Sequence, residues 1–198
     1  MSIAPIAPFA VALVALTSIL LLVSRNWRVS ISALGAQYLA VFILIMISWP
    51  IEYAAIKLIA GWMAAAVLGL GLAEQVDAWE DELGSSVSGI LFRLFMAGFV
   101  LFFAFSATSD AARWLLRAAN LQIQAGLILI GMGLLHLGLT AQPIRSVLAL
   151  MTVLSGFEIF YATMETALLV NAILAAITLS LAFTAAYLRV APLMEREE

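Results

Sequence analysis

The sequence predicts an all-α, polytopic integral membrane protein, a bundle of about seven transmembrane helices. Hydrophobic residues make up 65% of its 198 residues and charged residues 11%, whereas soluble domains have about 45–50% and about 25%. The mean hydropathy is +1.14, and seven apolar windows are each long enough to cross about 30 Å of hydrocarbon as a helix. The loops between the windows are too short for a soluble catalytic domain, so we expect that the protein has no catalytic site of its own.

The charges around the windows predict an orientation with the N-terminus outside and the C-terminus inside. Arg25 and Arg28 follow the first window and no basic residue precedes it, which is the charge order of a retained helix and not of a signal peptide. Most of the other arginines then fall on the inner side, as the positive-inside rule requires. We therefore expect a multi-pass protein of the cytoplasmic (inner) membrane. The windows are 6–24, 30–49, 51–72, 88–107, 120–140, 146–164 and 167–188.

Two connections are short enough to be hairpin turns on the outer face. Trp49 and Pro50 separate the second window from the third, and Met164–Thr166 separate the sixth from the seventh. The connection between the third and fourth windows is longer and holds five acidic residues between positions 74 and 82. A charge run of this kind predicts a solvated loop.

A short helix is predicted at the outer interface after the fourth window. Ser109 and Asp110 have the side chains of a helix N-cap. Residues 111–117 combine apolar and basic positions, as in helices that lie in the plane of the membrane surface. Trp114 would anchor this helix at the interface.

The chain is predicted to form a single transmembrane domain, residues 1–198, with a candidate parallel repeat. The units 6–72 and 120–188 follow the same plan, with the helix 88–107 as connector. Each unit has a basic inner turn and then a tight outer turn, and both units begin on the outer side. A bundle with an odd number of helices can also be divided in this way without any duplication, so both interpretations stay open.

Glu158 is the deepest carboxylate in the sequence. It lies within the sixth window, where an ionisable side chain costs about 2.5–3.5 kcal/mol on insertion scales. Glu165 follows two helical turns later on the same face, so the two residues would form a proton path from the middle of the membrane to the outer surface. Under the alternative interpretation, Glu158 is a neutral or paired carboxylate packed against another helix and Glu165 is an exposed turn residue.

Lys57 and His136 complete the proton-path candidates. Lys57 lies near the outer end of the third window, and Arg93 near the inner end of the fourth, so both side chains are expected to reach the headgroups. His136 is the only histidine, and both a hydrogen bond to a neighbouring helix and a proton-relay role stay open for it. Hydrogen bonds between helices are also expected from Gln37, Gln122, Gln124 and Asn171.

The residue types that are absent or scarce in the chain exclude several kinds of functional site. Cysteine is absent and one histidine alone cannot build a metal site, so we expect no metal. We also expect no covalently bound cofactor, while contact with lipid or quinone stays open. The net charge of −3 and the scattered basic residues exclude a nucleic-acid surface.

Close packing between helices is expected at Gly61, Gly69, Gly131 and Gly156.

Two stretches of the sequence resemble a known family. The hairpin from Leu139 to Leu150, followed by an apolar helix with Gly156, is similar to the small K-type membrane subunit of complex I. It resembles still more the longer component E of hydrogenase-4 and formate hydrogenlyase-type complexes, whose opening hairpin is similar to residues 16–39. The resemblance implies a membrane-arm subunit beside larger antiporter-like subunits in a proton- or sodium-translocating redox complex.

The K-type family carries intramembrane glutamates on its second and third helices, and this chain departs from that pattern. Glu158 lies on the corresponding second helix, but an ungapped match from Arg145 puts Met151 at the family position. On the third helix, Leu174 occupies the position where a carboxylate is expected. With these departures, the resemblance implies a mainly structural relative with a minor proton-path role.

Three functions remain as predictions. The first is a non-redox integral membrane subunit of a larger energy-converting complex, a non-catalytic part of a membrane oxidoreductase that contacts other membrane subunits through small-residue helix faces. The second is a stand-alone small transporter or channel, with its substrate between the two three-helix units. The third is a scaffold subunit of a photosynthetic or respiratory assembly that holds pigment, quinone or lipid.

Overall fold

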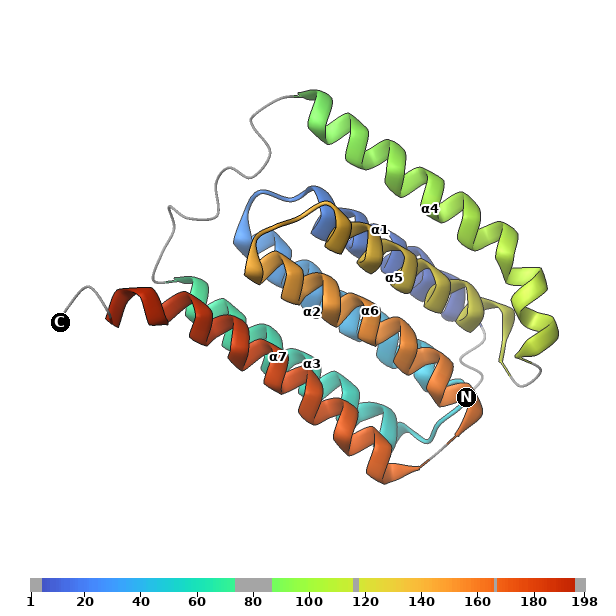
Figure 1. Ribbon diagram of the computed structural model, residues 1–198. Helices are drawn as coiled ribbons and strands as arrows, with labels where there is room; N and C mark the ends of the chain where they lie inside the picture. Colours follow the sequence, from blue (N-terminus) through green and yellow to red (C-terminus); the bar gives the residue numbers. More distant parts are fainter. Residues whose placement is uncertain (1–4, 74–86, 116–117, 166, 195–198) are drawn as a thin grey trace.

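The computed structural model of the chain describes residues 5–73, 87–115, 118–165 and 167–194, which form seven α-helices and no strand (Figure 1). Six of these helices are long and apolar enough to cross a membrane. The remaining one, α1, is apolar but has 17 residues, a length of about 26 Å at 1.5 Å per residue. The helical membrane bundle is thus as expected, and its orientation stays a prediction. The helices are α1 (Ala7–Val23), α2 (Trp27–Ile45), α3 (Ile51–Ala73), α4 (Val87–Trp114), α5 (Asn120–Gly138), α6 (Pro143–Met164) and α7 (Leu168–Met194).

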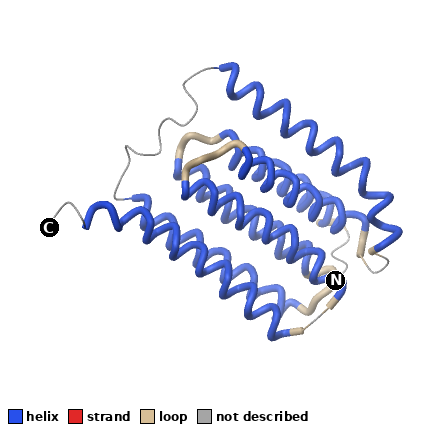
Figure 2. The backbone as a smooth tube through the Cα atoms, viewed as in Figure 1, coloured by secondary structure: helices blue, strands red, loops and turns tan. Residues whose placement is uncertain are grey.

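Short turns define two ends of the bundle (Figure 2). The turns at residues 24–26 and 139–142 lie at one end, here called the arginine end, and those at 46–50 and around 165 lie at the other, the Pro50 end. Asn26 starts α2 by accepting a hydrogen bond at its Oδ1 from the Arg28 backbone N–H, at 2.9 Å. Pro143 starts α6, at a position where its missing N–H costs least. Thr166 of the second predicted hairpin turn lies outside the described residues.

Corresponding helices of the two predicted units contact each other. α1 contacts α5, α2 contacts α6, and α3 contacts α7, while α4 lies against α5 and α1 (Figure 1). One sequence offset relates the units, because Ile51 and Leu168, which start α3 and α7, are 117 residues apart, as are Arg28 and Arg145. This arrangement is compatible with a parallel repeat, and the duplication itself stays a prediction.

The fourth helix is longer than predicted, and the prediction of a separate interface helix is wrong. α4 continues without a break to Trp114. The Ser109 hydroxyl donates to the Ser106 carbonyl at 3.4 Å, and the Thr108 hydroxyl donates to the Ala104 carbonyl at 2.7 Å. These hydroxyl groups bond to the preceding turn of the same helix and do not cap a new one. Arg117 and the predicted acidic loop at 74–82 lie outside the described residues.

Along α6, a layer of polar side chains lies between members of two hydrophobic clusters. The first cluster surrounds α1, α2 and α5 and includes Ile159 of α6, and the second lies nearer the arginine end and includes Leu148 and Met151 of α6. Between these positions, α6 carries three buried polar side chains. The whole layer consists of Gln37, Lys57, Thr152, Ser155, Glu158, Asn171 and Thr178.

Glycines lie where the helices approach most closely. A Cβ atom at Gly61 of α3 would overlap the ring of Tyr38 in α2, and one at Gly156 would lie 2.8 Å from the Gly126 carbonyl oxygen in α5. An added Cβ atom would lie 2.7 Å from Val100 of α4 at Gly131, whereas at Gly69 it would make only an ordinary contact, with Ile31 at 3.7 Å. The faces at Gly61, Gly131 and Gly156 are therefore occupied by helices of this chain.

Candidate functional site

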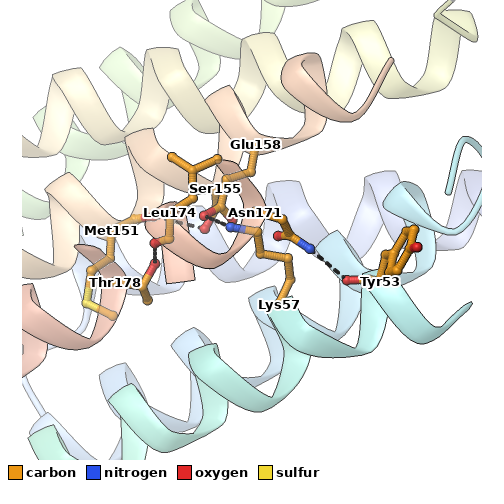
Figure 3. A network of polar contacts seen from close by, with 8 residues as sticks. All are labelled: Tyr53, Lys57, Met151, Ser155, Glu158, Asn171, Leu174 and Thr178. Atoms are coloured by element: carbon orange, nitrogen blue, oxygen red, sulfur yellow. Dashed lines mark hydrogen bonds and ion pairs between the residues drawn. The ribbon is translucent and has the colours of Figure 1, made fainter. Parts of the chain in front are cut away.

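Lys57 of α3 and Glu158 of α6 form an ion pair inside the bundle (Figure 3). The Lys57 Nζ donates to Glu158 Oε1 at 2.7 Å, and the two side chains are 2% and 1% exposed. The pair between Arg113 and Asp110 is different, because its side chains are 79% and 73% exposed. An exposed pair contributes little to stability, whereas a buried pair depends strongly on both of its partners.

The two charges lie at the same depth in the bundle. Lys57 is six residues after Ile51, the first residue of α3, and Glu158 is six residues before Met164, the last residue of α6. Both positions are therefore about 9 Å from the Pro50 end. The prediction that Lys57 reaches the headgroups is wrong, because its flexible stem instead carries the ammonium group inward to a buried carboxylate of opposite charge.

Amide and hydroxyl groups of α6 and α7 surround the pair. Asn171 of α7 donates from Nδ2 to the Tyr53 carbonyl of α3 at 3.1 Å. Ser155 and Thr178 each donate to the carbonyl four residues earlier, at 2.9 and 3.0 Å (Figure 3). Their hydroxyl oxygens can therefore still accept hydrogen bonds.

Several buried oxygen atoms in the polar layer or beside it make no hydrogen bond within the described part of the chain. They are Glu158 Oε2, Tyr38 OH, Gln37 Oε1 and Asn171 Oδ1. The Tyr38 ring lies near Ser155, Thr178 and Glu158. Because buried polar atoms are normally hydrogen-bonded, these oxygen atoms can accept hydrogen bonds from water molecules around the ion pair, and Glu158 Oε2 can also accept a proton.

The expected amide bonds between helices are found for three of the four residues. Gln37 donates to Thr152 Oγ1 of α6 at 3.4 Å, and Asn171 bonds α7 to α3. Gln122 of α5 donates to the Leu44 carbonyl of α2 at 2.9 Å. Gln124 is half-buried and makes no such bond among the described residues.

Glu165 and His136 lie apart from the ion pair. Glu165 is an exposed residue that follows the last turn of α6, seven residues or about 10 Å beyond Glu158. His136 lies two residues before the end of α5, at the arginine end. Its Nε2 is buried and has no partner in the described part of the chain, so this nitrogen does not form the predicted bond to a neighbouring helix.

Two arginines are buried at the arginine end, where they bind the C-terminal ends of helices. Arg93 of α4 is 5% exposed and donates to the carbonyls of Leu22 and Leu139, at the ends of α1 and α5. Arg145 of α6 donates to the Ser24 carbonyl at 3.3 Å. The last carbonyls of a helix lack intrahelical partners and carry partial negative charge. The prediction that Arg93 reaches the headgroups is therefore wrong, because these carbonyls bind its guanidinium group inside the bundle.

Replacing Arg93 by Leu is expected to lower the free energy of unfolding by about 1–2 kcal/mol. The carbonyls of Leu22 and Leu139 lose a charged donor, and water at the end of the bundle replaces only part of what is lost. Thermal unfolding in detergent measures the change. Arg113→Leu is the control, because that side chain is 79% exposed. Equal losses in the two variants would contradict the role assigned to Arg93.

The arrangement permits one simple reaction. A proton can pass from the Lys57 ammonium group to the Glu158 carboxylate over a single hydrogen bond of 2.7 Å. The products, an amine and a carboxylic acid, are neutral, so after the exchange neither side chain of the pair carries a charge in the apolar interior. No known protein family matches the chain, and no curated protein or solved structure is significantly similar to it.

Proposed function

We propose that the chain is a non-redox integral membrane subunit of a larger energy-converting complex, in which the Lys57–Glu158 pair takes part in proton movement. The buried pair is the observation that supports this proposal. A buried ion pair is often no more stable than packed apolar side chains of similar size. Ionisable residues inside membranes commonly belong to ion or proton pathways, so function accounts for this pair better than stability does.

The resemblance to K-type subunits and to component E supports the same proposal. It implies an intramembrane carboxylate on the helix that carries Glu158, although the family position corresponds to Met151, seven residues earlier. The cation beside that carboxylate comes from the first half of the chain, as Lys57, while Leu174 of α7 is buried and uncharged. In the proposed orientation, with the N-terminus outside, the Pro50 end faces outward.

Purification of the tagged full-length chain from membranes of its own host tests the subunit proposal. A mild detergent should return other integral membrane subunits in fixed stoichiometry, together with the redox cofactors of the complex in the visible spectrum. Recovery of this chain alone, as a monomer or a small homo-oligomer, would overturn the proposal and favour a transporter.

Removal of both charges is expected to abolish proton movement in the assembled complex. The variant Lys57→Met with Glu158→Met keeps the size of both side chains but has no group that can exchange a proton. Proton uptake is measured with a pH-sensitive dye in inverted membrane vesicles energised by respiration. The part of this uptake that depends on the complex should be at least tenfold slower in the double variant. The control is Arg113→Gln, at an exposed position. Unchanged proton uptake by the double variant would remove the pair from the mechanism.

A stand-alone transporter is the second candidate, and one observation favours it. Lys57 belongs to the first three-helix unit and Glu158 to the second, so the ion pair joins the two units. Transporters built from repeats commonly bind their substrates at such an interface, near the middle of the membrane. The purification experiment distinguishes the two candidates.

A further inference from the structure

A polar pocket opens at the Pro50 end of the bundle, between the ends of α2 and α6 and the start of α5. Its volume is about 430 Å³. Ser48, Gln122, Thr163 and Glu165 line it with polar groups, and Ala162 also contributes to its wall. At about 30 Å³ per molecule, a cavity of this size holds on the order of ten water molecules.

Hydrogen bonds hold the wall of this pocket in place. Gln122 donates from Nε2 to the Leu44 carbonyl and to Ser48 Oγ, both at 2.9 Å, and its Oε1 accepts from the Ala119 backbone N–H at 3.1 Å. On the opposite side, Trp49 Nε1 donates to the Glu165 carbonyl at 3.1 Å. The pocket is therefore bounded by bonded groups of three helices and is not a gap between loose loops.

The pocket comes within one helical turn of the ion pair. Ala162 is four residues after Glu158 on α6, which corresponds to a rise of about 6 Å. Ile159 and Ala162, two buried apolar residues of the first hydrophobic cluster, lie in that turn of α6. The barrier between the pocket and the pair is thus short and apolar.

Toward the arginine end, a much longer apolar distance separates the ion pair from the end of the bundle. Glu158 is fifteen residues after Pro143, the first residue of α6, so the arginine end is about 22 Å away. The second hydrophobic cluster lies on this side and includes Leu34, Leu68 and Leu148, none more than 1% exposed. The pair is consequently placed for exchange with one end of the bundle.

We propose that the pocket is a water-filled antechamber through which protons reach and leave the Lys57–Glu158 pair, from the Pro50 end only. The inference rests on the proposed role of the pair in proton movement. Its occupants are water and hydronium ions, and the Glu165 carboxylate draws cations to the mouth of the pocket. The apolar turn at Ile159 and Ala162 is the barrier that a proton crosses between the antechamber and Glu158.

Thiol labelling tests the antechamber, because the chain contains no cysteine. Thr163→Cys puts a thiol in the pocket wall, and Met164→Cys puts one at the exposed rim of α6. A membrane-impermeant thiosulfonate that carries a trimethylammonium group is added to membranes in which the Pro50 end faces the medium. Both thiols should react, and Ser155→Cys, at a fully buried position one turn on the far side of Glu158, should stay unmodified.

Inverted vesicles are then prepared from the labelled membranes, so that the Pro50 end faces the lumen, and proton uptake is measured in them. The trimethylammonium adduct at Thr163→Cys should slow proton uptake at least fivefold, and a reductant that removes the adduct should restore it in the same sample. An unreactive Thr163→Cys beside a reactive Met164→Cys would overturn the antechamber. Proton uptake that stays unchanged after labelling would also overturn the antechamber, provided that loss of both charges abolishes uptake in the same complex. If loss of both charges has no effect, the role of the pair fails, whereas labelling of Thr163→Cys still measures whether water fills the pocket.

Discussion

Replacing Lys57 alone by Met should lower the free energy of unfolding by about 3–5 kcal/mol, the usual cost of breaking a buried ion pair. Glu158 is 1% exposed and loses the cation that is bonded to its Oε1. Its carboxylate would then have to stay charged in an apolar interior or bind a proton. Glu158→Met should cost a similar amount, because it leaves the Lys57 ammonium group unpaired. Thermal unfolding in detergent, followed by circular dichroism, measures both variants.

The double variant, Lys57→Met with Glu158→Met, should be much more stable than the sum of the single changes predicts. Met has nearly the length of both side chains and leaves no buried charge behind, so the double variant should lie within about 1 kcal/mol of the original chain or above it. The difference from additivity gives the coupling between the two residues. Additive losses would mean that the two side chains do not interact in the folded protein.

This cycle also separates the structural role of the pair from its role in proton movement. A double variant that folds and assembles normally has lost only its charges. Loss of proton uptake in that variant then follows from the missing proton-exchanging groups and not from unfolding. The pair would thus be retained for function, because the protein would be at least as stable with apolar side chains at the two positions.

The helices of this protein could be predicted from its sequence, because each one needs about 20 apolar residues to cross the membrane. The sequence leaves open that Glu158 is paired, but it does not identify Lys57 as the partner. Hydropathy gives the depth of a residue but not the direction of its side chain. Lys57 and Glu158 lie on helices that run in opposite directions. Measured from the same end, both lie six residues inside their helices, and this equality was the signal for a pair.

The burial of Arg93 could not be predicted in the same way. Its partners are the backbone carbonyls of Leu22 and Leu139, and every residue carries such a group. Only the meeting of two helix ends beside α4 makes these carbonyls available, and that depends on tertiary packing. The separate helix at 111–117 was predicted because Ser109 and Asp110 are common both at helix N-caps and within turns. The bond from Ser109 to the preceding turn favours the continuous helix.

Gly61→Ala should lower the free energy of unfolding by about 3 kcal/mol, the upper part of the usual range for overpacking. An added Cβ atom would overlap the Tyr38 ring at Cγ, the ring carbon nearest the α2 backbone. A flexible side-chain end could move aside, but this atom cannot, so α2 and α3 must separate. Tyr38 also lies near Ser155 and Thr178 of the polar layer, so the displacement should reach the surroundings of the ion pair.

Gly35→Ala is the matched control within α2, because a Cβ atom there meets no other atom within 4 Å. Alanine is the better helix former by about 1 kcal/mol, so this variant should be as stable as the original chain or slightly more stable. Thermal unfolding in detergent should therefore move in opposite directions for the two variants. If Gly61→Ala were as stable as Gly35→Ala, the helices would not approach as closely as described, and helix propensity alone would decide both results.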